Sequence, residues 1–101
     1  MVYKIFIVED DKVISQKMAE FLSSWNYQVR QVHDFSKVME EFIAFDPDLI
    51  LMDITLPHLN GYHWTLEIRK FSKVPILFVS SANDDMNIVM AISQGAGDYI
   101  T

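Results

Sequence analysis

The sequence predicts an α/β protein built on a doubly wound parallel sheet. Two observations predict this class. Short apolar runs rich in β-branched residues recur along the chain, and helix-length segments with apolar residues at helical spacing separate them. Strands that alternate with crossover helices form a parallel sheet with right-handed connections. With 101 residues, 50% of them hydrophobic and 22% charged, the chain forms one globular domain.

The chain opens with a predicted strand and helix. Residues 4–8 are β-branched and aromatic, as expected of a buried first strand. From residue 12 to residue 25 the apolar side chains fall at helical spacing, which places them on one face. This face consists of Ile14, Met18, Phe21, Leu22 and Trp25. Acidic residues just before the helix favour the positive end of its dipole.

An edge strand and a second helix follow. Residues 28–32 alternate apolar with polar side chains, a pattern typical of a strand with one wetter face. The second helix is capped by Asp34 or Ser36 and is stopped by Asp46-Pro47. Its predicted buried stripe consists of Val38, Met39, Phe42 and Ile43.

The third strand is predicted at the centre of the sheet. Residues 49–52 are four consecutive apolar residues, the pattern of a strand buried on both faces, although so short a run is also compatible with a buried helix segment. Asp53 is then the first residue to emerge at the carboxyl end of this strand. Pro57 and Gly61 indicate a shaped loop before a helix resumes near Tyr62.

The remaining segments continue the alternation of helix and strand. The stripe of the third helix is Trp64, Ile68 and Phe71. Pro75 opens a fourth strand over residues 76–79, a position where proline is tolerated. The stripe of a fourth helix is Met86, Val89 and Met90. Gly95 is its expected left-handed cap, and residues 98–101 begin a fifth strand.

In the flavodoxin-like strand order 2-1-3-4-5, acidic residues meet at one crevice. Strands one and three flank the switch point of that order, which brings together Glu9, Asp10 and Asp53. Three neighbouring carboxylates raise the pKa of at least one of them unless a divalent cation is bound, and all-oxygen ligands select Mg²⁺. Beside such a metal, ionised Asp53 could accept a phosphoryl group, and Ser80 at the next strand end offers a hydroxyl.

Each of these signals also has a purely structural interpretation. The acidic triplet of residues 9–11 could only cap the helix, Asp53 could form a strand-end turn, and Ser80 could cap the next helix. Tyr99 could be an ordinary half-buried strand residue. Three histidines without ligand spacing are read as surface or loop residues: His33, His58 and His63. The joint placement of acids and hydroxyls at successive strand ends favours a site.

Taken together, these motifs resemble a known family over the whole chain. They are Val8-Glu9-Asp10-Asp11, Asp53 with Pro57 and Gly61, Ser80, and Gly95-Ala96 leading to Tyr99-Ile100-Thr101. The chain resembles the receiver domain of two-component response regulators, most closely that of winged-helix (OmpR/PhoB-type) regulators. Phe-Ser-Lys-Val-Met and Pro-Ile-Leu-Phe-Val-Ser-Ser are further similar to a Gram-positive subgroup that responds to cell-envelope peptides.

The resemblance implies a CheY-like fold and a role for each site residue. Asp53 would be the phosphoacceptor, taking the phosphoryl group of a sensor histidine kinase. Ser80 would follow the phosphoryl group, and Tyr99 would be the aromatic switch that rotates inward. The implied Mg²⁺ ligands are Asp10, Asp53, Glu9 through water and the backbone carbonyl of Thr55. Such a domain is not an enzyme with turnover, since it catalyses only its own phosphorylation and dephosphorylation.

The resemblance also implies partners. A face formed by helix four and strand five would mediate homodimerisation, and DNA would be reached only through an output domain that controls transcription. A net charge of −6 with scattered basic residues argues against direct nucleic-acid binding by this domain. The absence of cysteine fits a reducing compartment, and no apolar run reaches membrane-spanning length. We therefore expect a cytoplasmic protein that does not enter the membrane.

Two departures from the family pattern qualify these expectations. Members normally follow this threonine with Lys-Pro and a fifth helix, whereas the sequence stops at Thr101. We therefore expect residues 1–101 to be a receiver domain incomplete at its C-terminus and a piece of a longer regulator. Such a piece would leave one flank of the sheet bare, and would self-associate or have low stability. Gly97 stands where an acid is usual, which affects loop flexibility.

Two other functions compete with the phosphorylation switch. A receiver-like module without the lysine could act through constitutive pairing, and phosphorylation-independent association would favour it. A small nucleotide- or flavin-binding α/β protein would need a glycine- or hydroxyl-rich phosphate loop after strand one, where this chain has acids. Purified protein that is colourless and free of nucleotide would exclude the second alternative.

Overall fold

The protein folds into a mixed sheet with helices on both faces. The computed structural model describes residues 2–53, 61–79, 90–92 and 99–100. The strand order is β2-β1-β3-β4-β5-β6. The first four strands are β1 (Lys4–Val8), β2 (Gln28–Gln31), β3 (Leu49–Asp53) and β4 (Ile76–Val79). All pairings among these four strands are parallel. The predicted α/β class and its order 2-1-3-4 are therefore confirmed.

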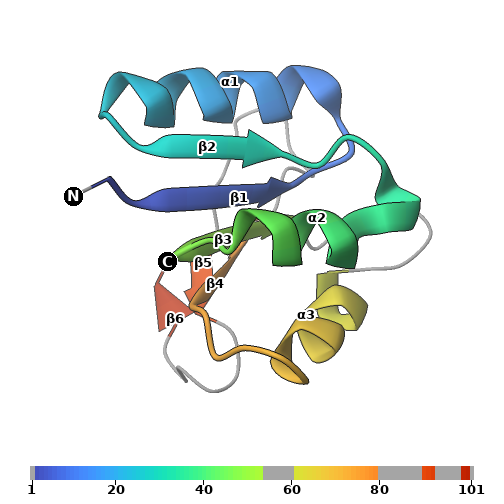
Figure 1. The fold of residues 1–101 in the computed structure, drawn as a ribbon. Coiled ribbons are helices and arrows are strands. Elements are labelled where there is room, and N and C mark those ends of the chain that lie inside the picture. Colours follow the sequence, from blue (N-terminus) through green and yellow to red (C-terminus); the bar gives the residue numbers. More distant parts are fainter. Residues whose placement is uncertain (1, 54–60, 80–89, 93–98, 101) are drawn as a thin grey trace.

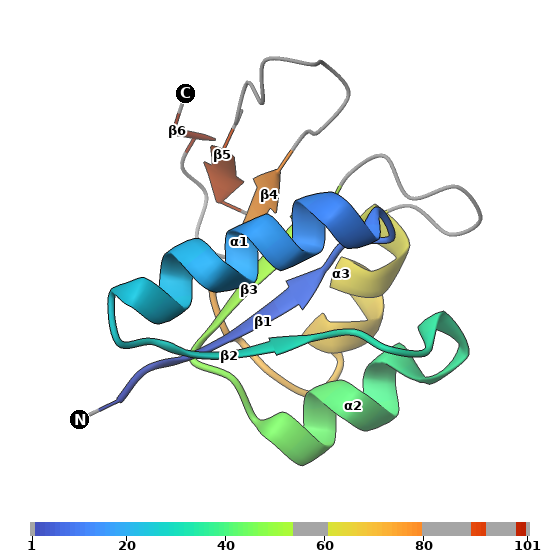
Figure 2. The ribbon, with the colours of Figure 1, turned by 90° about the horizontal axis from the view of Figure 1, so that it is seen from above.

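The helices divide between the two faces of the sheet. Helix α1 (Lys12–Ser24) lies on one face, and α2 (Val38–Phe45) and α3 (Gly61–Arg69) lie on the other (Figure 1). Seen from above, α1 crosses over β1 (Figure 2). Among the described residues, no helix has both the length and the apolar character needed to cross a membrane.

The core lies between the sheet and the pair α2 and α3. Phe6, Ile50 and Ile76 are paired across β1, β3 and β4 and are completely buried in one cluster. On the opposite face of the same strands, Leu51 and Leu77 are paired and only half-buried. The prediction that β3 is buried on both faces therefore holds fully for the face toward α2 and α3, and in part for the face that carries α1.

Two small side chains are the most buried residues of α1. They are Ser15 and Ala19, while Ile14, Met18 and Leu22 of the predicted apolar face are half-buried. Phe21 and Trp25, which helical spacing places on the apolar face expected to pack against the core, are 63% and 65% exposed and contact each other with ring centroids 6.4 Å apart. The prediction was wrong for these two because helical spacing identifies an apolar face but not how much of it another element covers.

Helix α2 is entered through a short 3-10 turn and ends in a left-handed residue. Asp34 caps this turn (Phe35–Lys37), as one of the two predicted caps. Asp46 adopts φ 51° and donates its N–H to the Phe42 carbonyl at 2.9 Å, which ends the helix before Pro47. Ile43, predicted in the buried stripe, is 59% exposed because it lies one residue, and so about 100° around the helix, from buried Phe42.

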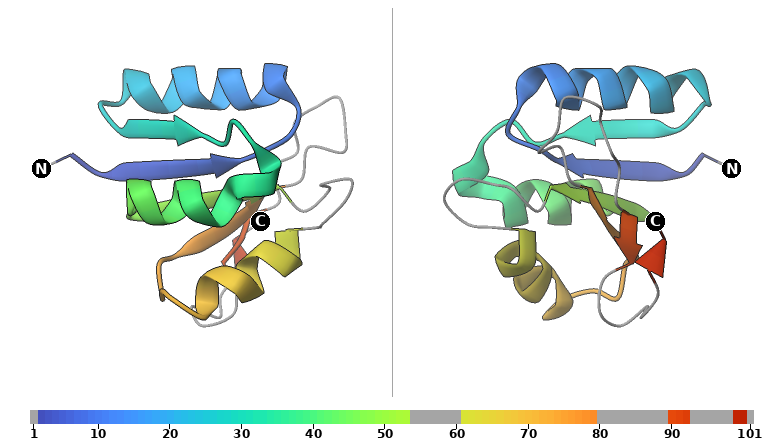
Figure 3. Two further views of the ribbon diagram at one scale, coloured as in Figure 1. Left: turned by 45° about the vertical axis from the view of Figure 1, so that its right-hand side comes forward. Right: turned by 180° about the vertical axis from the view of Figure 1, so that it is seen from behind.

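Beyond β4 the sheet departs from the prediction (Figure 3). Strand β5 (Met90–Ile92) pairs antiparallel with β4 where a fourth helix was expected, and β6 (Tyr99–Ile100) pairs antiparallel with β5 instead of parallel with β4. A three-residue apolar run has no periodicity that separates helix from strand, and its pairing provides partners for backbone groups of β4. The predicted helix residues Met86 and Val89 and the predicted cap Gly95 lie outside the described residues.

Candidate metal centre at the strand ends

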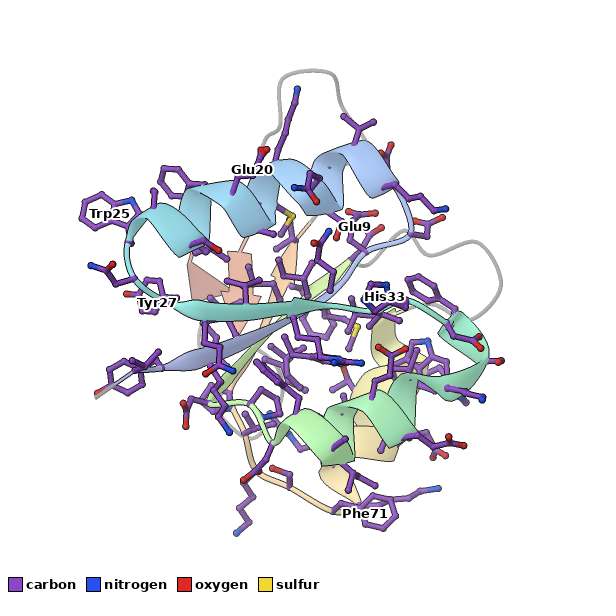
Figure 4. The ribbon with its side chains drawn as sticks, turned by 45° about the horizontal axis from the view of Figure 1, so that its top comes forward. Glu9, Glu20, Trp25, Tyr27, His33 and Phe71 are labelled. Atoms are coloured by element: carbon purple, nitrogen blue, oxygen red, sulfur yellow. The ribbon has the colours of Figure 1, made fainter. Side chains whose placement is uncertain are left out.

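The carboxyl ends of β1 and β3 bring acidic side chains together. Val8 is opposite Met52 in the parallel register, so Glu9 and Asp53, the next residue of each segment, are neighbours. Asp10 follows Glu9 and precedes Asp11, the N-cap of α1. In parallel sheets the crevice beyond the strand ends is where ligands bind, and Figure 4 shows Glu9 at this end, beside the start of α1.

Three carboxylates form a compact group. Glu9, Asp10 and Asp53 each offer an oxygen atom, and these atoms lie within 4.8 Å of one another. Glu9 is 4% exposed and Asp53 is 2% exposed, whereas Asp10 is open to solvent. The group therefore has one buried member just after β1, one buried member at the end of β3 and one member at the surface, an arrangement open to solvent on one side.

The environment of Glu9 disfavours its charged form. Its Oε2 accepts the N–H of Asp11 at 3.0 Å, while Oε1 is buried without a hydrogen-bond partner among the described residues. Burial first, and then the neighbouring carboxylate of Asp53, raise the pKa of Glu9 from 4.5 to about 8, although the hydrogen bond from the Asp11 N–H acts in the opposite direction. A proton or a cation near Oε1 relieves this conflict.

The residues fit a hard divalent cation. The donor set is entirely carboxylate oxygen, which Mg²⁺ prefers, and Mg²⁺ commonly takes one or two carboxylates and keeps several waters. A cation would also supply the partner that buried Glu9 Oε1 lacks among the described residues. The donor set contains no imidazole or thiolate, the ligands typical of zinc.

Asp11, the third acid of the run, has a different position. Its Oδ1 accepts the N–H groups of Val13 at 2.9 Å and Ile14 at 3.1 Å, which makes it the N-cap of α1. The capping interpretation of the acidic triplet therefore applies to Asp11, while Glu9 and Asp10 join Asp53. Sequence reasoning did not separate these roles, although the residue next to the first helical position is the ordinary place for a cap.

The structure places only some of the other predicted site residues. Thr55 and Ser80 lie outside the described residues, and Tyr99 is described as a backbone position in β6. His33 is exposed, as predicted. His63 is half-buried on α3, with its ring 4.9 Å from that of Trp64. His58 lies outside the described residues.

Comparison with known proteins gives one consistent family. The family model described as the response regulator receiver domain matches residues 5–101. A protein named sensory transduction protein BceR from Halalkalibacterium halodurans is 44% identical over 97% of this chain. The response regulator protein GraR of Staphylococcus aureus is 39% identical over 96% of it. The chain spans 42% and 43% of the lengths of these two relatives.

Solved structures agree with the sequence comparison. The N-terminal domain of the nisin resistance regulator NsrR, described as a lantibiotic response regulator, is 54% identical with a TM-score of 0.74. That match covers 84% of this chain and 72% of the other. The BeF3-activated receiver domain of RstA from Klebsiella pneumoniae is 31% identical, with a TM-score of 0.72, over 83% of this chain and 72% of the other.

Proposed function

Because the chain belongs to the family of response regulator receiver domains, we propose that Asp53 accepts a phosphoryl group from a sensor histidine kinase in a Mg²⁺-dependent reaction. One observation carries the proposal: the strand ends bring three carboxylates within 4.8 Å, and two of them are buried. A receiver domain of this kind is a signalling module and has no external substrate to turn over.

The transfer step needs no general base. The ionised carboxylate of Asp53 attacks the phosphorus atom, an O–P bond forms, and the N–P bond to the kinase histidine breaks with its electron pair left on the nitrogen. The product is an acyl phosphate on the protein. Ser80, by the resemblance, would donate its hydroxyl to a phosphoryl oxygen.

The proposed Mg²⁺ ligands are Glu9, Asp10, Asp53 and the carbonyl of Thr55. The bound ion would supply charge neutralisation for the phosphoryl oxygens and for the crowded carboxylates. Glu9 contributes a buried oxygen without a hydrogen-bond partner among the described residues, and Asp10 lies at the solvent side of the group. Asp53 would supply the carboxylate oxygen that attacks phosphorus.

The downstream events belong to the whole regulator. We propose that phosphorylation biases Ser80 and Tyr99 toward an active arrangement, promotes homodimerisation and controls transcription through an output domain that binds DNA. BceR and GraR are named as sensory transduction and response regulator proteins, and each is more than twice as long as the match. The likeness to a regulator described as a lantibiotic response regulator supports an antimicrobial peptide as the stimulus. Membership of the receiver-domain family supports the cytoplasm as the compartment.

Intact-mass measurement with acetyl phosphate tests the proposed acceptor. With Mg²⁺ the parent chain should gain one phosphoryl group, as acetate leaves, and with excess EDTA it should gain none. Asp53→Asn should gain none in either case, while Asp48→Asn, a matched change at the start of β3, should behave as the parent. A folded parent that binds Mg²⁺ but gains no mass would refute the proposal and favour the non-switching interaction module.

A further inference from the structure

Asp11 stands next to the proposed metal centre without belonging to it. The group of oxygens within 4.8 Å comprises Glu9, Asp10 and Asp53, and Asp11 is not among them. Its Oδ1 is engaged by the N–H groups of Val13 and Ile14. Asp11 is also exposed, so its charge faces water. The position of Asp11 therefore argues against a direct role as a metal ligand.

The backbone of Asp11 touches Glu9. Its N–H donates to Glu9 Oε2 at 3.0 Å, and its carbonyl accepts the N–H of Ser15 at 2.9 Å as the first hydrogen bond of α1. The residue is extended, with φ −74° and ψ 109°, the conformation in which the side chain can reach back to the helix N-terminus. The cap thus holds the backbone that presents the N–H to Glu9.

The first turn of α1 is itself joined to the sheet. Ser15 is buried, and its Oγ accepts a hydrogen bond of 2.8 Å from Nε2 of Gln31 in β2. A continuous set of hydrogen bonds therefore runs from Gln31 through Ser15 and Asp11 to Glu9. One end, Gln31, lies in β2 and the other, Glu9, directly follows β1, which limits how far the start of α1 can shift relative to the strand ends.

We infer that Asp11 is a positioning residue for the metal centre: its side chain caps α1, its N–H holds Glu9 Oε2, and Glu9 Oε1 is thereby left for the cation. This inference rests on the proposed function, since it assumes that Glu9 serves the metal. It goes further by assigning the two oxygens of Glu9 different tasks and by giving Asp11 a role that depends on hydrogen bonding instead of charge. Partners that orient metal ligands commonly affect metal affinity by about 10–100-fold.

A pair of isosteric and truncated variants separates capping from charge. Asp11→Asn and Asp11→Ala remove the same negative charge, but asparagine keeps an oxygen that can cap the helix. The probe is Mn²⁺, whose free concentration is read from its electron paramagnetic resonance signal. We expect Asp11→Asn to bind Mn²⁺ within about threefold of the parent and Asp11→Ala to bind about tenfold more weakly. Equal affinities of the two variants would overturn the inference.

Two further variants control for stability and for general capping effects. Asp11→Gly lacks the capping side chain but disturbs the helix start less than alanine, so it should fold and still bind Mn²⁺ about tenfold more weakly. Asp34→Ala removes a comparable exposed cap, one that accepts the N–H of Ser36 and is not in the metal group, and should leave the affinity unchanged. If the glycine variant kept the parental affinity, the role of Asp11 would be refuted but the proposed function would stand. If the folded parent bound no Mn²⁺, both the role of Asp11 and the proposed function would be refuted.

Discussion

Glu9 is the residue at which the requirements of folding and of function oppose each other. It is buried beside Asp53, and its pKa is raised to about 8. A carboxylate placed this way destabilises the metal-free fold whenever it is ionised. A divalent cation would bind the same buried negative charge. The free energy by which the ionised carboxylate destabilises the metal-free fold would therefore favour metal binding.

The sign of the Glu9 shift predicts how stability varies with pH. Between pH 4.5 and about 8 the folded, metal-free chain holds a proton that the unfolded chain has released, so the free energy of unfolding falls as pH rises. Glu9→Gln should remove this slope. Between pH 6 and pH 8 the free energy of unfolding of the parent should fall by up to about 2–3 kcal/mol, whereas that of the variant should stay constant. Urea unfolding in EDTA at the two pH values measures it.

Glu20→Gln is the matched control, since Glu20 is exposed on α1. It should keep the pH slope of the parent. If Glu9→Gln and Glu20→Gln showed the same slope, the assignment of a raised pKa to Glu9 would be wrong. Mg²⁺ should flatten the slope of the parent, because the cation binds the ionised form.

Residue roles were only partly predictable from the sequence. Strand order placed Glu9, Asp10 and Asp53 together because the period of a strand and the parallel register fix which residues reach the same edge. The role of Asp11 depends on which side-chain oxygen reaches which N–H, and neither periodicity nor composition contains that information.

At the scale of elements, Glu41 joins β2 to α2. Its side chain, 11% exposed, accepts the N–H groups of His33 and Asp34 and pairs with Arg30 at 3.2 Å. Partial burial alone would raise its pKa, but the two N–H groups and Arg30 together lower it below 4.5. One ionised side chain therefore satisfies backbone donors of the connection that precedes α2.

Replacing Glu41 should weaken this connection in a pH-dependent way. Glu41→Gln should lower the free energy of unfolding by about 1–3 kcal/mol at pH 7, because hydrogen bonds to a charged acceptor are lost. A lowered folded-state pKa gives stability that is present above pH 4.5 and lost as pH falls through the folded value. The free energies of unfolding of the parent and the variant should therefore become equal as the pH is lowered from 7 into the acid range. Urea unfolding at a series of pH values measures them.

The neighbouring exposed residue Glu40 supplies the comparison for this test. Glu40→Gln should change stability by less than about 0.5 kcal/mol. An equal loss in both variants would mean that helix charge, and not the hydrogen bonds of Glu41, explains the effect.

Element boundaries show where sequence reasoning succeeds and fails. Strands β1, β3 and β4 appear where apolar runs predicted them, and α1 ends one residue from its predicted limit. The failure is at β5, where Met90–Ile92 forms a strand. A short apolar segment takes the structure of the edge available to it, and that edge is a tertiary feature.

At the scale of the whole molecule, stability rests on the core between the sheet and the pair α2 and α3. Ile50 lies at its centre with no exposed surface, between Phe6 and Ile76. Ile50→Val should lower the free energy of unfolding by about 1 kcal/mol, because one buried methylene is lost and a small cavity remains. Ile43→Val, the same change at an exposed site, should cost less than about 0.5 kcal/mol by denaturant unfolding. Similar costs at both sites would contradict this placement of the core.

The two faces of the sheet differ in how completely they are covered. Leu51 and Leu77 remain half-buried on the face that carries α1, and Phe21 and Trp25 of α1 are exposed. Figure 4 shows Trp25 and Tyr27 at the end of α1 away from Glu9. The apolar pattern predicted a third strand buried on both faces and one apolar face for the first helix, because a pattern records which residues can be buried and not how completely other elements cover them.

Chemical location of the phosphoryl group tests the proposed acceptor most directly. The chain is treated with acetyl phosphate and Mg²⁺, the acyl phosphate is reduced with borohydride, and the masses of the proteolytic peptides are measured. We expect residue 53 alone to be converted from aspartate to homoserine, and omission of Mg²⁺ to prevent the conversion. Reduction at Asp10 or at another acid, or no reduction in a folded chain that binds Mg²⁺, would contradict the assignment of Asp53 as the phosphoacceptor.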